Sequence, residues 1–122
     1  MSDLLKTLPR RIKIGHYTWR VVVGDSVTHP EQLEGAHGLT DYDTLKIYIR
    51  ADEALSITVD TVLHELDHAI NYAANLTDNS LEEEYVTRGT TVRLDTYLRN
   101  PRLWVWMNRA MRELKRDARS EE

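Results

Sequence analysis

The chain has 122 residues, of which 41% are hydrophobic and 30% charged, and its formal net charge is -4 with neutral histidines. This length predicts one domain with one modest core, and the composition is that of an ordinary globular protein. Because there is no cysteine, disulfides and thiolate metal sites are excluded, so a metal ion must be bound by histidine and carboxylate. The net charge is negative, and no apolar run is long enough for a membrane span or a signal peptide. We therefore expect a cytoplasmic protein without membrane or nucleic-acid partners, and the sequence leaves the oligomeric state open.

Two β-hairpins are predicted within residues 10–50, after a helical turn near the N-terminus that Pro9 ends. Apolar and polar residues alternate along both hairpins, and the expected turns are at Gly15-His16 and Asp43-Thr44. The segment between the hairpins is rich in turn-forming residues and is expected to be a connection.

From about Leu55 the apolar residues recur with the period of a helix, and this period continues almost to the C-terminus. We predict three helices, over residues 55–75, 80–99 and 101–117, with a frayed tail after them. The second helix is expected to bury Val86, Thr90, Leu94, Tyr97 and Leu98. Strands first and helices after predict an α+β domain spanning residues 1–122, with a small antiparallel sheet of three to four strands packed on three helices.

The first predicted helix contains the stretch TVLHELDHAI, which places His64 and His68 four residues apart with Glu65 between them. Residues four apart lie on one face of a helix, so both imidazoles can reach one ion, and zinc accepts such nitrogens at roughly 2.1 Å. Glu65 is rotated by about 100° and is a poor third ligand, but it can reach a water on the metal. This HExxH pattern of two ligands and a general base predicts a zinc site.

A catalytic zinc site needs a third protein ligand and one open position. Three consecutive glutamates, at positions 82–84, begin the second helix and are the candidates. Glu83 shares the predicted buried face best and is our choice, with Glu82 as the alternate third ligand. The glutamates of this run that do not bind the metal are expected to lie in a solvated first helical turn, where their negative charge stabilises the helix N-terminus.

Other polar residues have simpler interpretations. We expect Asp67 to be an exposed helix carboxylate or an acceptor for a ligand imidazole. His16 and His29 are expected in turns, and only one of Trp104 and Trp106 can face the core. A basic stripe on or near the last helix could associate with nucleic acid, but because the net charge is negative we favour a solvated face. It comprises Arg99, Arg102, Arg109, Arg112, Lys115 and Arg116.

The KIYIR strand, the TVLHELDHAI helix, the EEEYV helix start and LRNP at 98–101 together resemble minimal zinc metallopeptidases of the gluzincin group. The likeness extends over about residues 38–105, and it is to ImmA/IrrE-like and SprT-like proteins, especially short peptidase-like proteins of tailed bacteriophages. The resemblance implies a zincin-like fold, His64 and His68 as zinc ligands, Glu65 as the catalytic base and a glutamate among 82–84 as the third ligand. It also implies that a strand within 38–50 pairs with extended substrate backbone. A phage origin would place the protein in the host cytoplasm.

The expected function is therefore zinc-dependent hydrolysis of a peptide bond in a protein or peptide substrate. Possible oxyanion donors are Tyr48, Tyr85, Arg88 and His37, and the sequence does not choose among them. The alternative is a regulatory or protein-binding module that keeps a peptidase fold with a structural or weakly active zinc site. Such a site would have four protein ligands, with the fourth from His16, His29, His37 or a second glutamate.

Overall fold

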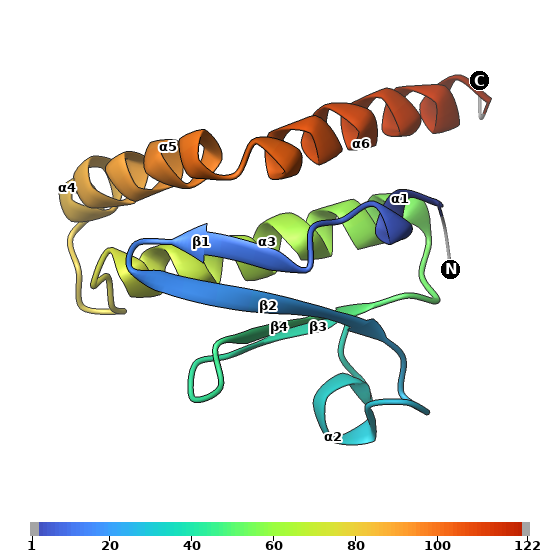
Figure 1. Ribbon diagram of the computed structural model, residues 1–122, viewed down its shortest axis with the longest axis horizontal. Coiled ribbons are helices and arrows are strands. Elements are labelled where there is room, and N and C mark those ends of the chain that lie inside the picture. The colour runs from blue at the N-terminus through green and yellow to red at the C-terminus, as the bar shows by residue number, and fades with distance from the viewer. Residues whose placement is uncertain (1–2, 121–122) are drawn as a thin grey trace.

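The computed structural model of the protein describes residues 3–120 (Figure 1). The strands are β1 (Arg11–Ile14), β2 (Tyr17–Gly24), β3 (Gly38–Asp41) and β4 (Lys46–Arg50). The helices are α1 (Asp3–Lys6), α2 (Pro30–Leu33), α3 (Leu55–Ala73), α4 (Glu82–Glu84), the π-helix η1 (Tyr85–Gly89), α5 (Thr90–Arg99) and α6 (Pro101–Ser120). The class is α+β, as predicted. Both hairpins are present, and α3 begins and ends within two residues of the predicted bounds.

The four strands form one mixed sheet in the order β1-β2-β4-β3. Each hairpin is antiparallel, but β2 and β4 pair in parallel, so the prediction of an antiparallel sheet is wrong for the central pair. The reason is the crossover through α2, which carries the chain past β4 to the far edge before it returns. As a result β1 and β3 are the two edge strands of the described sheet.

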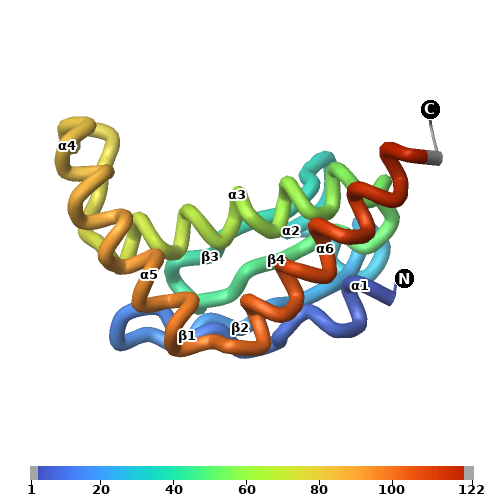
Figure 2. Tube along the Cα trace, turned by 90° about the horizontal axis from the view of Figure 1, so that it is seen from above, coloured from blue at the N-terminus to red at the C-terminus, as the bar shows by residue number. Residues whose placement is uncertain are grey.

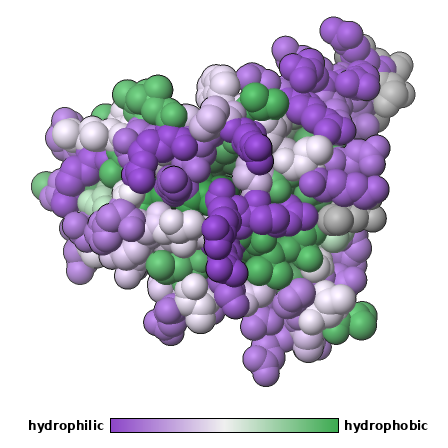
Figure 3. Space-filling model, in the orientation of Figure 1, coloured by the Kyte–Doolittle hydropathy of each residue, from purple (hydrophilic) through white to green (hydrophobic). Residues whose placement is uncertain are grey.

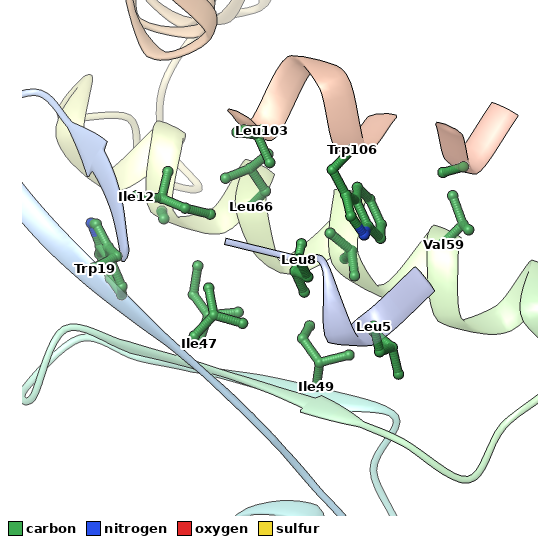
Figure 4. Close-up of a cluster of buried hydrophobic side chains, with 14 of the residues drawn as sticks. Leu5, Leu8, Ile12, Trp19, Ile47, Ile49, Val59, Leu66, Leu103 and Trp106 are labelled. Atoms are coloured by element: carbon green, nitrogen blue, oxygen red, sulfur yellow. The ribbon is translucent and has the colours of Figure 1, made fainter. Parts of the chain in front are cut away.

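The core lies between one face of the sheet and helices α3 and α6 (Figure 4). Alternation along β1 and β4 turns Ile12, Ile47 and Ile49 inward, where they meet Leu66 of α3. Trp106 of α6 is 2% exposed and donates its indole N–H to the carbonyl oxygen of Leu4 at 2.7 Å. This contact fixes the N-terminal segment beneath the last helix.

The helices divide between the two faces of the sheet (Figures 1 and 2). Helix α3 lies over β3 and β4, and α5 and α6 follow the β1 side of the same face. The short helix α2 lies on the opposite face, where Tyr48 is buried and its ring is 5.8 Å from that of His29. Because α3 lies over β3 and β4, its exposed face lies beside the edge strand β3.

The second predicted helix is interrupted by the π-helical turn η1, and its expected buried face is wrong. Val86, Leu94 and Leu98 are 56%, 61% and 72% exposed, and Thr90 is exposed as well. Gly89 and Thr96 are buried instead, with Val92 and Tyr97 partly buried. A π turn holds more residues than an α turn, so spacing counted across it no longer predicts which side chains share a face.

The last helix extends to Ser120, beyond the predicted end at 117, so residues 116–120 are helical and not frayed as expected. The last two residues of the predicted frayed tail lie outside the described residues. Trp106 is buried whereas Trp104 is 52% exposed, so only one of the two faces the core, as predicted. Among residues 3–120, the structure contains no helix with both the length and the apolar character needed to cross a membrane.

Candidate metal centre

Helix α3 presents His64 and His68 on its exposed face, one turn apart. Their Nε2 atoms lie 3.1 Å apart and their ring planes are nearly perpendicular, at 84°. Residues on the opposite side of the helix, including Val62, Leu66 and Ile70, are buried. The apolar stripe thus fixes the rotation of α3 and directs both imidazoles outward to one point.

The distance between the imidazole nitrogens tests whether the pair suits a metal. Two nitrogens bound at roughly 2.1 Å to a tetrahedral ion would lie roughly 3.4 Å apart. The observed 3.1 Å requires only a small movement of either side chain. His64, Glu65 and His68 each offer a ligand atom within 4.8 Å of the others, so a divalent cation bound by the two histidines would lie close to the Glu65 carboxylate.

Glu65 is 6% exposed, although it is a carboxylate on a surface helix. The Thr40 hydroxyl of β3 donates to Glu65 Oε2 at 2.7 Å and also lies 3.2 Å from the backbone oxygen of the same residue. One carboxylate oxygen is therefore held by the edge strand, whereas Oε1 has no hydrogen bond from another side chain among the described residues. Gly38 permits this approach, because a Cβ there would lie 3.0 Å from Glu65 Cγ and 2.7 Å from Thr61 Cγ2.

Two hollows lie on either side of the histidine pair. One is lined by His37, Gly38, Asp60, Thr61, His64 and Glu65. The other is lined by Tyr42, His68, Asn71, Tyr72, Leu76, Thr77, Asp78 and Tyr85. Because β3 runs from the first hollow towards the second, an extended chain beside this strand would pass over Glu65.

The glutamates at 82–84 lie outside the group formed by the two histidines and Glu65. Glu83 accepts a hydrogen bond from the Thr87 hydroxyl at 3.3 Å, and Glu84 pairs with Arg88. Glu82 and Glu83 are exposed. The reason for preferring Glu83, a face shared with Val86, Thr90 and Leu94, does not hold because that face is exposed. The identity of the third ligand stays a prediction.

The remaining predicted residues divide between the site and other places. His37 and Tyr85 each line one of the hollows, and Tyr85 donates its hydroxyl to the carbonyl oxygen of Thr77 at 2.8 Å. Tyr48 is buried on the opposite face of the sheet, next to His29. Tyr48 is therefore poorly placed to stabilise an oxyanion at the histidine pair.

Exposed Asp67 pairs with Arg93 at 3.2 Å and so ties α3 to α5. This matches the expectation of an exposed helix carboxylate. His16 lies exposed in the turn between β1 and β2, as expected.

Three residues near the site were missed from the sequence. Thr40 positions the carboxylate of Glu65, and Asp78 lines the same hollow as His68. Tyr42 lines that hollow as well, and its partial burial, followed by the charge of Glu65, raises the pKa of its hydroxyl. Only Thr40 had a possible signal: in a strand it alternates with Leu39, which places the two on opposite faces.

Comparison with family models, with curated protein sequences and with solved structures gives no match for this chain.

Proposed function

We propose that the protein is a zinc-dependent peptidase in which His64 and His68 bind the metal and Glu65 is the general base. The observation that carries the proposal is the convergence of both Nε2 atoms, 3.1 Å apart, beside a buried glutamate that an edge strand holds. A bound zinc ion would polarise the substrate carbonyl and lower the pKa of the attacking water.

Glu65 has two distinct oxygens in this arrangement. Thr40 occupies Oε2, so Oε1 takes the proton from water and later gives it to the nitrogen of the leaving amine. The buried setting keeps bulk water away from the carboxylate, and the hydroxyl limits its rotation. Tyr42 lines the same hollow as His68 and is close enough to feel the charge of Glu65, so we assign its hydroxyl as the donor to the developing oxyanion.

The proposed substrate is a protein segment in extended conformation. Strand β3 pairs only with β4 within the described sheet, so its other edge is available for backbone hydrogen bonds to a peptide. Gly38 and Thr40 hold this strand against α3 at Thr61 and Glu65. A peptide added there would place its carbonyl groups beside the histidine pair.

The third ligand is proposed to be a carboxylate, with Glu83 and then Glu82 as candidates from the sequence. Asp78 is added because it lines the hollow that contains His68. His16, His29 and His37 lie outside the group of ligand atoms around the histidine pair, so we propose none of them as the fourth ligand of a closed structural site. We place this activity in the cytoplasm, which is the host cytoplasm if a phage encodes the protein.

The proposal is tested by zinc titration calorimetry together with cleavage of dye-labelled casein. We expect one zinc ion per chain, loss of zinc binding in His64→Ala and His68→Ala, and wild-type zinc binding without cleavage in Glu65→Gln. Asp67→Asn is the matched control, because Asp67 lies on the same helix between the ligands but pairs with Arg93. It should retain both properties.

Titration of Glu82→Ala, Glu83→Ala, Glu84→Ala and Asp78→Ala identifies the third ligand, since its loss should weaken zinc binding by more than about 100-fold. Equal zinc binding by the wild type and His64→Ala would refute the metal assignment. Cleavage by Glu65→Gln at the wild-type rate would refute the general base.

A further inference from the structure

Positive charge is concentrated in the two terminal parts of the chain. Fourteen of the 16 Lys and Arg residues lie within 1–20 and 88–122, whereas fourteen of the 20 Asp and Glu residues lie within 21–87. The terminal parts meet where the side chain of Asn100 donates to the backbone oxygen of Lys13 at 2.7 Å and accepts from its N–H at 2.9 Å. The fold thus gathers cations that the net charge of -4 does not reveal.

At this junction the structure has a cleft of about 740 Å³ between the N-terminal segment and the α5–α6 corner. Its lining contains six cationic residues and no acidic residue. The cations are Lys6, Arg10, Arg11, Lys13, Arg99 and Arg102. Such a concentration of one sign of charge in a concave surface attracts anions strongly.

The acidic side chains near this cleft neutralise only part of its charge. Lys6 pairs with exposed Asp3 at 3.4 Å, and Arg99 pairs with exposed Asp95 at 3.3 Å. Arg10 instead donates to two backbone carbonyl oxygens, at 3.0 and 2.9 Å, and partial burial lowers the pKa of its guanidinium. An anion entering the cleft would therefore stabilise cations that are already close together.

The outer face of α6 extends this positive surface towards the C-terminus. A further hollow there is lined by cations alone, at Arg112, Lys115, Arg116 and Arg119. Figure 3 shows hydrophilic side chains crowded over this end of the helix, at the upper right. The helix has 20 residues and is therefore about 30 Å long, and cations lie along it from Arg102 to Arg119. Arg109 lies between the two hollows and pairs with Glu113 at 3.1 Å, so the remaining cations form an interrupted strip and not a single spot.

We propose that the cleft and the outer face of α6 form a binding surface for the phosphate backbone of a nucleic acid. A regularly charged polymer matches a strip of this length, and arginine, the commoner cation here, suits phosphate oxygens. A concave cleft admits a strand better than it admits a flat lipid surface.

This surface is separate from the metal centre. The cleft adjoins β1 and the histidine pair adjoins β3, and these strands are the opposite edges of the sheet. The acidic middle of the chain carries the metal centre, so it repels phosphate from that side. Nucleic-acid binding therefore does not depend on the proposed peptidase activity.

The test is fluorescence anisotropy with fluorescein-labelled 20-base-pair DNA and a single strand of the same length, over a series of salt concentrations. For the duplex, each lost phosphate contact reduces the slope of log K against log salt by about 0.9. We therefore expect the double variant Arg11→Gln/Arg102→Gln to reduce the slope by about 1.8. If the two proteins bind equally at 1 M salt, a slope smaller by about 1.8 means that the double variant binds about 60-fold more weakly than the wild type at 0.1 M salt.

The matched control is Lys46→Gln/Arg88→Gln, which removes the same charge outside the cleft and should change affinity by less than about threefold. All four positions lie outside the buried core, so folding should survive and circular dichroism checks it. If both double variants lost the same amount of DNA affinity, the cleft would not be the binding site. Absence of binding to either oligonucleotide, or binding only to phosphatidylserine vesicles or to polyglutamate, would overturn the proposal.

Discussion

The hydrogen bond between Thr40 and Glu65 makes a sharp prediction about stability. In Thr40→Val the side chain keeps its shape but loses the hydroxyl that donates to Glu65 Oε2 at 2.7 Å. Glu65 is 6% exposed and Thr40 8%, so water does not easily replace the donor. A hydrogen bond to a charged group contributes about 1.5–3 kcal/mol, and that is the expected loss of unfolding free energy at neutral pH.

Urea unfolding measures this loss, as a decrease in midpoint of about 1 M for a protein of this size. In a Glu65→Gln background the acceptor is neutral, so Thr40→Val should cost only about 0.5–1.5 kcal/mol. The control Thr18→Val changes an exposed strand position and should shift stability by less than about 0.5 kcal/mol. If Thr40→Val cost the same in both backgrounds, the hydroxyl would not be bound to a charged Glu65 and the positioning argument would fail.

Three further predictions concern other contacts. Gly38→Ala would place a Cβ 2.7 Å from a methyl carbon of α3, so we expect about 1–3 kcal/mol of destabilisation in urea and slower casein cleavage. Asn100→Ala removes three hydrogen bonds, two of them to Lys13, and should lower the unfolding free energy by about 1.5–4.5 kcal/mol. Hydrogen bonds from Thr44 lower the pKa of Asp41, so its charge stabilises the fold above its usual titration range and this contribution disappears as pH falls. The stability difference between the wild type and Asp41→Asn should therefore close between roughly pH 5 and pH 2, as thermal unfolding can show.

Features that depend on local periodicity were predictable from the sequence. The hairpin turns and helix α3 follow from alternation and from a 3.6-residue period. The imidazoles of His64 and His68 converge because the two residues are four apart on that helix. The parallel pairing of β2 with β4 was not predictable, because it joins the two hairpins through a crossover that leaves no periodic signal. Contacts between distant residues, such as Thr40 with Glu65, were missed for the same reason.

The π-helical turn explains why the choice of third ligand was the weakest step. Spacing along an uninterrupted α-helix favours Glu83, but η1 intervenes between this residue and α5. Leu94, which was to mark the buried face, is 61% exposed, whereas Thr96 is fully buried. Sequence spacing gave no sign of the altered register, since Arg88-Gly89 fits either kind of helix.

The burial of Glu65 is hard to explain by stability alone. A charged carboxylate loses much of its hydration at 6% exposure, and Thr40 is the one side chain with a hydrogen bond to it among the described residues. An apolar residue at this position would pack beside Thr61 and Gly38 without that penalty. Proteins retain such locally unfavourable groups mainly where function requires them, and this one stands between two histidines whose nitrogens converge. The cost of burying this charge therefore supports the proposed role of Glu65 as a general base.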